Sequence, residues 1–350
     1  MILNIIGNGF DLYHGLPSGY YHFACYLIEK DPEFYDEIVN MFNLGGYKKM
    51  KSPIEDDFVY VVEEELWKNF EKNLGNINEY SIVGTHVDDL RLENDDPVDL
   101  QMNDDIIAEN LKKAFTHWVR DTLDKKENYD LILEEMKEAK EKVNFSDDEY
   151  FLEFNYTHTL QNIYKISEDR IHYVHGECLG NDNDELIIGH GNDYAIEDVK
   201  DKINILEDEY DYTQSSLNER DEYTCLLNIL RELRKDVNIC KSHCQSYYNR
   251  IEGDIDLIRV FGLSLGEVDM PYLQQIKEKW PEAKWEFAYY NEADITNVNE
   301  ATKILNINEK QYDLFKFSNE HQLEILNKII SLQGITEYEK VNKAIKSCNH

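Results

Sequence analysis

The fold is decided by residues 2–9, which read ILNIIGNG. A short, mostly apolar and partly β-branched run that ends at a glycine-rich turn is typical of a buried strand. Further along, Tyr20, Phe23, Ala24 and Leu27 share one helical face in a segment from about residue 18 to 30. The chain is therefore expected to begin with a strand, a tight turn and a helix.

Strand-like runs recur along the chain, and most of them lie next to a turn or a helical segment. They are residues 150–154, 171–174, 186–188, 255–261, 285–290 and 312–317. A further helix is expected from Pro271 to Trp280. Alternation of strands and helices predicts an α/β fold of Rossmann-like type, with a mostly parallel sheet and helices on both faces.

Two long segments interrupt this alternation. Residues 31–145 and 197–251 carry apolar residues at helical spacing among many charged ones. One such series is Phe58, Val61, Val62, Leu66, Trp67 and Phe70. We interpret both segments as large helical insertions. The core is then built from residues 1–30, 146–196 and 252–318, and residues 319–350 form a C-terminal helical tail.

The charge of the chain limits its partners. Its 350 residues include 36 Lys and Arg against 71 Asp and Glu, a net charge of −35. Such a surface repels phosphate backbones and anionic lipid, so neither nucleic acid nor a membrane is expected as a partner. Hydrophobic residues make up 42% of the chain, which is enough for a sizeable core. Much of the acid lies in the insertions, so a small anion held by backbone N–H groups stays compatible with the charge.

No run resembles a signal peptide or a membrane-spanning segment, and the six cysteines are scattered. We therefore expect reduced thiols and a cytoplasmic protein. Cys240, His243 and Cys244 lie within one helical turn, but a zinc site needs further ligands and no second pair has this spacing. We expect a packed helix face there and no metal.

The first motif with chemical potential is IGNGFDLYHGLP, residues 6–17. Gly7 and Gly9 permit a tight turn and the close approach of a backbone to a ligand. Backbone N–H groups near a helix start would suit a pyrophosphate, and Asn8 and Asp11 can hydrogen-bond a ribose or an amide. A simple turn explains the same letters, because the third glycine of a GxGxxG fingerprint is missing.

Two more motifs follow predicted strands. Asn155 comes directly after the strand at 150–154, and Thr157 is expected to cap the next helix with its hydroxyl group. His175 stands before Gly176 at the end of another strand, where an imidazole can act as a general base near neutral pH. A turn asparagine and a structural histidine are the alternative interpretations.

The fourth motif is FGLSLGEVDMPY, residues 261–272. Gly262 and Ser264 would line a strand-end loop, and Asp269 is expected to cap the following helix. Because the carboxyl ends of parallel strands meet at one edge of a sheet, all four motifs would share one crevice.

By its letters, this motif also matches the GxSxG elbow of serine hydrolases, which requires an aspartate and then a histidine after the serine. Asp269 or Asp294 with His321 meets that order formally. However, His321 lies in a polar helical stretch, which disfavours a hydrolase of this type.

The motifs together resemble the AbiH family of bacterial phage abortive-infection proteins. The matching segments are IGNGFDLYHGLPSGY (6–20), LWKNFEKNLG (66–75), FLEFNYTHTLQNIY (151–164), YVHG (173–176), LIIGHG (186–191) and VFGLSLGEVDMPY (260–272). Trp67 and Glu71 resemble the signature of the second segment. The segments occur in the family's order and span most of the chain.

AbiH proteins are in turn distantly similar to sirtuin-like NAD-binding and NAD-hydrolase domains. Gly7-Asn8-Gly9 resembles the sirtuin Gly-Ala-Gly loop, and Gly262-Leu263-Ser264-Leu265 resembles the Gly-Thr-Ser-Leu loop on the adenosine side. Asn155 and His175-Gly176 resemble the asparagine at the nicotinamide ribose and the catalytic His-Gly. Thr157 departs from the sirtuin aspartate, and the zinc-binding cysteine pairs of the deacetylases are absent.

The resemblance implies an anti-phage protein that binds NAD and hydrolyses its nicotinamide N-glycosidic bond, with Asn155 and His175 as catalytic residues. The residues implied in binding are Gly7, Asn8, Gly9, Phe10, Asp11, His14, Tyr156, Thr157, Gly176, Gly262, Ser264, Leu265 and Asp269. Glu71 and His190 are candidates for an accessory carboxylate or second base.

Two other functions remain open. The first is a sensor that binds a nucleotide without turnover and recognises a phage-derived trigger protein through its insertions. The second is a metal-dependent toxin that acts on nucleic acid with Asp, Glu and His190 as ligands, which the charge of −35 disfavours. A homo-oligomer is compatible with either.

Overall fold

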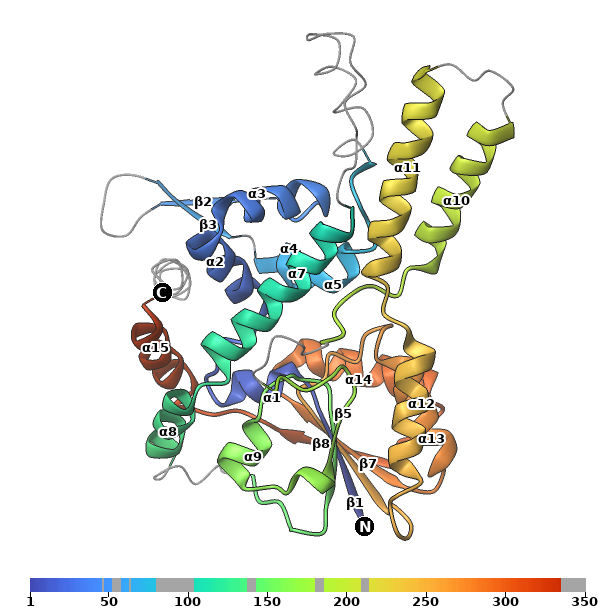
Figure 1. The fold of residues 1–350 in the computed structure, drawn as a ribbon. Helices are drawn as coiled ribbons and strands as arrows, with labels where there is room; N and C mark the ends of the chain where they lie inside the picture. The colour runs from blue at the N-terminus through green and yellow to red at the C-terminus, as the bar shows by residue number, and fades with distance from the viewer. Residues whose placement is uncertain are drawn as a thin grey trace. The chain divides into compact units, whose positions relative to one another are not determined.

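The computed structural model describes residues 1–45, 47–51, 58–62, 64–79, 104–136, 143–179, 186–208 and 214–334 (Figure 1). The chain divides into two compact units. The first comprises Met1–Gly19, Thr116–Leu186 and Asp236–Ile335. The second comprises Tyr20–Phe115, Ile187–Lys235 and Thr336–His350. The predicted boundaries of the core and its insertions remain predictions.

The first unit is built on a six-stranded sheet in which all neighbouring strands are parallel. Its strands are β1 (Ile2–Ile6), β4 (Tyr150–Glu153), β5 (Ile171–Tyr173), β6 (Leu257–Phe261), β7 (Lys284–Tyr289) and β8 (Tyr312–Lys316). Their order in space is β5-β4-β1-β6-β7-β8. The chain first builds outward from β1 in one direction and then returns to build outward in the other. The sheet therefore has a topological switch point between β1 and β6, where α/β proteins bind ligands.

The central strand β1 shows why this sheet forms. Leu3, Ile5 and Ile6 are completely buried, and Ile5 pairs with Leu152 on β4 and with Val260 on β6. A parallel strand that is covered on both faces reads as a nearly continuous apolar run. The first residues of the chain are such a run, which is why they occupy the middle of the sheet.

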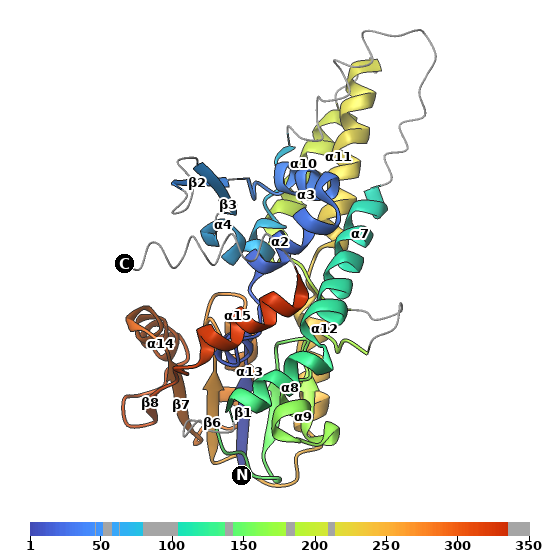
Figure 2. The same cartoon turned by 90° about the vertical axis from the view of Figure 1, so that its left-hand side faces the viewer.

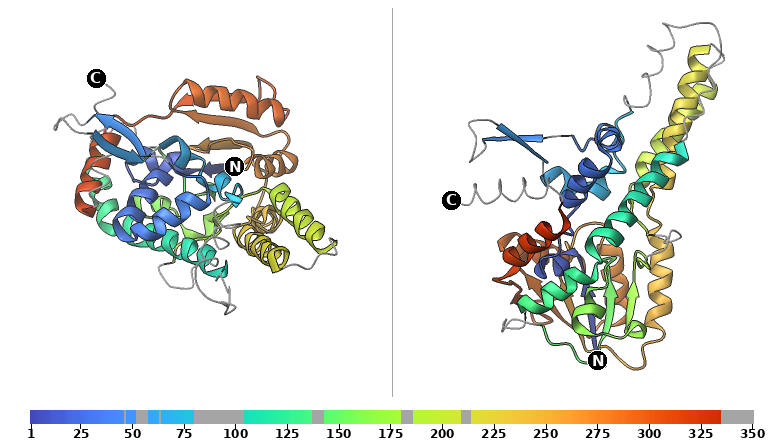
Figure 3. Two further views of the ribbon diagram at one scale, coloured as in Figure 1. Left: turned by 90° about the horizontal axis from the view of Figure 1, so that it is seen from above. Right: turned by 60° about the vertical axis from the view of Figure 1, so that its left-hand side comes forward.

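Helices cover both faces of this sheet. The helices of the first unit are α1 (Asn8–Tyr13), α8 (Lys126–Glu135), α9 (Thr159–Tyr164), α12 (Val237–Tyr248), α13 (Met270–Lys279), α14 (Glu292–Ile304) and α15 (Gln322–Gln333). One apolar cluster joins α1, α8, α9 and α15 to the face that carries Phe151 and Phe261. Helix α8 lies beside both α9 and α15 (Figure 2). On the opposite face, Tyr247 of α12 stacks on His172 of β5 at 5.1 Å between ring centroids. The α/β fold with helices on both faces is thus confirmed (Figure 3).

The second unit is mostly helical. It contains α2 (Tyr20–Lys30), α3 (Pro32–Met41), α4 (Glu64–Lys68), α5 (Phe70–Asn73), most of α7 (Asp104–Trp118), α10 (Asp193–Asp208) and α11 (Gln214–Glu232). Part of its core is aromatic: Trp67 is buried and stacks on Phe70 at 5.3 Å and on Tyr35 at 6.0 Å. The paired helices α10 and α11 pack against each other.

Three local predictions differ from the structure. Phe58, Val61 and Val62, read as part of a helix, lie in strand β3 (Phe58–Val62), which pairs antiparallel with β2 (Tyr47–Lys51). Three valines in five residues favour a strand, and this β propensity outweighs the apparent helical spacing. Residues 186–188 form no strand; His190 makes an isolated bridge with Arg234 instead. The turn expected after β1 is the start of helix α1.

Several other predictions fall outside the described residues, namely those on residues 80–103 of the acidic segment and on 335–350 of the tail. Within the ranges that are described, the five cysteines Cys25, Cys178, Cys225, Cys240 and Cys244 are all buried and form no disulfide. The same ranges contain no helix with both the length and the apolar character needed to cross a bilayer.

Candidate functional site

The four sequence motifs meet at the carboxyl edge of the sheet in the first unit. Gly7 directly follows β1 and Gly262 directly follows β6. Asn155 and His175 each stand two residues beyond the ends of β4 and β5. Because these four strands are neighbours in the sheet, the predicted residues gather at the carboxyl ends of the strands, beside the switch point. The positions of the motifs directly after the predicted strands indicated this placement.

The glycines at the switch point serve the close packing of two loops. A Cβ atom on Gly7 would lie 2.6 Å from the Cα of Leu263, and one on Gly9 would lie 2.6 Å from the Cα of Gly262. Gly262 has a φ of +63°, and its own Cβ would lie 2.3 Å from the nitrogen of Phe10. Only hydrogen fits in these places, so the glycines let the two backbones touch.

This contact also uses backbone donors that the sequence suggested for a phosphate. The N–H of Gly7 donates to the carbonyl of Phe261 at 2.8 Å, and the N–H of Gly9 donates to the carbonyl of Gly262 at 2.8 Å. In this conformation both groups are engaged within the chain. Asn8 between them is exposed. Binding of a dinucleotide by this loop stays a prediction.

Asp11 is the centre of a buried polar cluster that joins the first two motifs. Its side chain accepts hydrogen bonds from the hydroxyls of Thr157 and Thr159, each at 2.6 Å, and the residue is only 1% exposed. Asn155 donates from its amide to the carbonyl of Gly7 at 3.2 Å. Glu153 accepts a hydrogen bond from the backbone N–H of Asn155 at 3.1 Å. We call Asp11, Glu153, Asn155, Thr157 and Thr159 the Asp11 cluster.

Thr157 was expected to cap the following helix, and this expectation is wrong. Helix α9 begins at Thr159 and His158 occupies its N-cap position. The Thr157 hydroxyl is directed to Asp11 instead, because a buried carboxylate without donors would be costly.

Two carboxyl groups of the Asp11 cluster have raised pKa values. Burial raises the pKa of Asp11, the hydrogen bonds from Thr157 and Thr159 lower it, and the result is about 6. Burial, reinforced by the nearby charge of Asp11, raises the pKa of Glu153 well above its usual value. The cluster therefore holds one carboxyl group, that of Asp11, that can change protonation close to neutral pH, and displaced pKa values of this kind are typical of functional sites.

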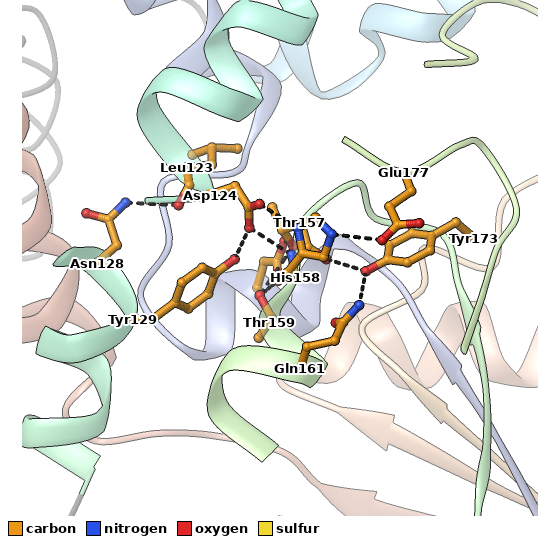
Figure 4. A network of polar contacts seen from close by, with 11 residues as sticks. Leu123, Asp124, Asn128, Tyr129, Thr157, His158, Thr159, Gln161, Tyr173 and Glu177 are labelled. Atoms are coloured by element: carbon orange, nitrogen blue, oxygen red, sulfur yellow. Dashed lines mark hydrogen bonds and ion pairs between the residues drawn. The ribbon is translucent and has the colours of Figure 1, made fainter. Parts of the chain in front are cut away.

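A second polar group lies beside the first, centred on His158 (Figure 4). Its ring nitrogens contact Asp124 at 2.5 Å and Glu177 at 2.9 Å, and its backbone N–H also donates to Asp124. Burial lowers the pKa of His158, but the hydrogen bonds and charges of Asp124 and Glu177 raise it more strongly, to about 9. His158 is therefore an imidazolium at neutral pH and suits charge stabilisation better than general base catalysis.

Two tyrosines complete this network. Tyr129 donates its hydroxyl proton to Asp124 at 2.5 Å. Tyr173 donates to the carbonyl of Thr157 at 3.2 Å and accepts from the amide of Gln161 at 2.8 Å (Figure 4). The network thus connects the loop after the π-helical turn (Val119–Leu123) to the segment that carries the Asp11 cluster.

His175 lies in an aromatic environment. Its ring meets those of Phe154 and Tyr272 edge to face, with centroids 5.5 Å and 5.9 Å apart, and the residue is 7% exposed. Gly176, which follows it, has a φ of +88° and thus adopts a conformation that favours glycine. Tyr156 is also buried.

The loop after β6 has its own hydrogen bonds. Ser264 donates to the Asp269 carboxylate at 2.6 Å, and the N–H of Gly266 donates to the same oxygen at 3.2 Å. Leu265 lies between them with a φ of +57°. Asp269 is the residue before α13, yet its side chain caps no N–H of that helix, so the predicted capping bond is wrong.

A serine hydrolase gains no support from this loop. None of the described histidines hydrogen-bonds to Ser264, whose carbonyl accepts from Asn297 instead. Helix α13 begins four residues after Gly266, unlike the sharp strand–serine–helix turn of a nucleophile elbow.

Two predicted binding residues help to hold the fold. The ring nitrogens of His14 contact the carbonyl of Phe10 at 2.7 Å and the hydroxyl of Tyr164 at 2.8 Å. The Phe10 ring is fully buried and stacks with Phe317 at 6.0 Å.

The two accessory candidates belong to the second unit. Glu71 pairs with Lys235 at 2.8 Å. His190 contacts the carbonyl of Leu230 at 2.9 Å and accepts from the N–H of Asn192 at 3.0 Å. Both side chains thus have partners within that unit.

Sequence reasoning missed Glu153, Asp124, Glu177 and the role of His158. His158 stands inside the quoted motif, but Asp124 and Glu177 carry no local signal among the 71 acidic residues. Across the described residues, no group of three or more His, Cys, Asp or Glu side chains is placed to hold a metal ion.

Comparison with known proteins identifies the family to which the chain belongs. The family model described as "Bacteriophage abortive infection AbiH" matches residues 3–289, most of the chain, and the chain belongs to this family. A curated relative is "Mannosyltransferase regulator 14" of Saccharomyces cerevisiae, which is 33% identical over 92 residues. That similarity covers 24% of this chain and 10% of the yeast protein, so the chain spans only a small part of that relative's length. No solved structure matches the chain.

Proposed function

From the membership of the chain in the bacteriophage abortive infection AbiH family, we propose that it is a phage-defence enzyme that hydrolyses the nicotinamide N-glycosidic bond of NAD. The site is the carboxyl edge of β1, β4, β5 and β6. The observation that carries the proposal is the pair of hydrogen bonds from Thr157 and Thr159 to Asp11, because they unite two sequence motifs in one polar cluster at the switch point.

The residues of this edge match the needs of the reaction. Cleavage develops positive charge on the ribose as neutral nicotinamide leaves, and a water molecule then adds to the sugar carbon and loses a proton. The Asp11 carboxylate, ionised above a pKa of about 6, would stabilise that charge. Asn155 would orient the ribose hydroxyls and the water, and His175 would accept the proton.

Asp11 can also replace a carboxylate that is missing from the matching motif. Thr157 stands at the position where the similar sirtuin-like proteins carry an aspartate, so this motif has no carboxylate at that position. The Asp11 carboxylate lies 2.6 Å from the Thr157 hydroxyl. In the proposed mechanism Asp11 takes the place of that missing group, and neither Glu71 nor His190 is required.

The direct test is to incubate the purified full chain with NAD, alone and with an extract of phage-infected cells, and to measure nicotinamide and ADP-ribose by chromatography. Asp11→Asn, Asn155→Asp and His175→Asn should each lower the rate at least tenfold. His243→Asn is the matched control, because this histidine is exposed on α12 of the same unit. Absence of turnover by the wild type under both conditions contradicts the proposal.

A second function is favoured by one specific feature of the site. Gly7, Gly9, Asp11 and Asn155 all have internal hydrogen-bond partners, and Asp11 and Asn155 are buried. Such a closed arrangement suits a sensor whose site opens when it binds a nucleotide. In that role the chain would recognise a phage-derived trigger protein without turning the nucleotide over. Saturable binding of NAD by calorimetry, with intact NAD recovered afterwards, would favour this sensor over the enzyme.

A further inference from the structure

The first unit contains a cavity of about 550 Å³ that is lined by none of the residues proposed above to bind or cleave NAD, although Tyr13 and Phe261 belong to two of the motifs. Its lining includes residues of β6, β7 and β8, which are adjacent in the sheet. Its size is within the range of small-molecule sites, which is roughly 300–1,000 Å³. Its lining residues are Tyr13, Val143, Asn144, Arg259, Phe261, Glu286, Phe315, Lys316, Phe317 and Ser318.

Aromatic rings dominate the apolar part of this lining. Tyr13 and Phe317 stack with their centroids 3.9 Å apart. Phe261 meets Phe315 and Phe317 edge to face, at 5.4 Å in both cases. Because these rings already pack on one another, they are held rigidly. They provide preformed surfaces on which the flat ring of a ligand can pack at little entropic cost.

The polar part of the lining is centred on Arg259. This residue pairs with Glu286 on the neighbouring strand, from Nε to Oε2 at 2.8 Å, and its Nη1 lies 3.7 Å from Glu149. Only the Nε hydrogen bond is made with the described residues, so the guanidinium keeps donors for a ligand. Its side chain is 25% exposed, which leaves it accessible from the cavity.

The charge of the lining contrasts with that of the whole protein. Arg259 and Lys316 are the cationic residues among those that line the cavity and Glu286 is the acidic one, with Glu149 near Arg259 outside the lining, whereas the chain as a whole carries a net charge of −35. The fork of a guanidinium binds carboxylates and phosphates well. Asn144 and Ser318 add neutral hydrogen-bonding groups to the same cavity.

We propose that this cavity is a binding site for a small molecule that carries both a flat aromatic ring and an anionic group. The ring lies among Tyr13, Phe261, Phe315 and Phe317, and the anion binds Arg259. The anion can be a phosphate or a carboxylate. The proposal is independent of NAD hydrolysis, because it uses neither Asn155 nor His175.

The test is calorimetric titration of the full chain at low salt with four probes. AMP and indole-3-acetate combine a ring with a phosphate or a carboxylate, adenosine has a ring without the anion, and inorganic phosphate has the anion alone. At least one of the first two should bind saturably, and tenfold or more tightly than adenosine and phosphate. The tighter of the two identifies the combination of ring and anion that the cavity prefers. Absence of saturable binding by both, or equal affinity for adenosine, overturns the proposal.

Variants then place the bound probe. Arg259→Lys keeps a charge beside Glu286 but loses the guanidinium fork, and should weaken binding at least tenfold. Phe315→Ala removes one partly buried ring, and Lys316→Ala one exposed charge; each should weaken binding at least threefold. Lys310→Ala is the matched control, because Lys310 is exposed and outside the lining. If Arg259→Lys fails to fold, the other two variants decide. Wild-type affinity in both Phe315→Ala and Lys316→Ala overturns the proposal.

Discussion

Thr157 donates its hydroxyl proton to the carboxylate of Asp11 across 2.6 Å, although 146 residues separate the two in the chain. The contact ties the helix that follows β1 to the segment that follows β4. Both residues are almost completely buried, so the bond is formed where water cannot replace it. The edge of the sheet is thus held together by a polar contact as well as by apolar packing.

The buried Asp11 should leave a signature in the pH dependence of stability. Its pKa rises from 3.8 to about 6 on folding, so the folded state binds more protons between pH 4 and 6. Stability from this group is therefore full below pH 4 and falls by about 3 kcal/mol as the pH rises through 6. Asp11→Asn should remove this fall, as measured by urea unfolding from pH 4 to 7. Parallel pH profiles of wild type and variant would contradict the burial of Asp11.

His158 should change stability in the same direction, but at higher pH. Its pKa rises from 6.5 to about 9 on folding, because Asp124 and Glu177 outweigh the effect of burial. The stability that the imidazolium contributes is full below pH 6.5 and is lost as the pH rises through 9, by up to about 3 kcal/mol. His158→Gln should be less stable than wild type at pH 6, with a difference that shrinks by pH 9.5. The exposed His243→Gln should show no such convergence.

The contact between the loops after β1 and β6 predicts a strong effect of one methyl group. Gly262→Ala places a Cβ 2.3 Å from the nitrogen of Phe10 at a positive φ, and should cost more than about 2 kcal/mol. Gly266→Ala in the same loop meets only the Ser264 hydroxyl at 3.5 Å and should stay within about 0.5 kcal/mol of wild type. Thermal unfolding of both proteins compares them. Equal melting temperatures would show that the loops do not touch.

In the second unit, Lys235 and Glu71 form a pair with side chains only 8% and 20% exposed. Lys235→Met leaves the Glu71 charge without its partner and should destabilise the protein by about 2 kcal/mol. The exposed pair of Lys200 and Glu197 provides the comparison, because Lys200→Met should cost less than about 0.5 kcal/mol. Denaturant unfolding of the two variants and of Glu71→Gln/Lys235→Met tests this. A smaller loss in the double variant is expected, since it leaves no unpaired charge.

How far the sequence predicts the structure depends on the kind of signal. Six of the seven predicted strands exist, because buried parallel strands are apolar runs bounded by turn residues. The error at 186–188 and the missed strand Phe58–Val62 both concern short segments, where periodicity cannot separate the two kinds of structure. The convergence of Gly7, Asn155, His175 and Gly262 at one edge follows from strand direction alone.

Local sequence patterns do not identify which side chains pair with one another within the site. Nothing local marks Asp124 and Glu177 as the acids that meet His158, or Arg259 as a cavity residue. The pattern of apolar runs and glycines in the chain was sufficient for the α/β class and for the edge at which its motifs gather. Which carboxyl meets which hydroxyl, and which pKa is displaced, came from folding, because burial and pairing depend on residues brought together across more than a hundred positions of sequence.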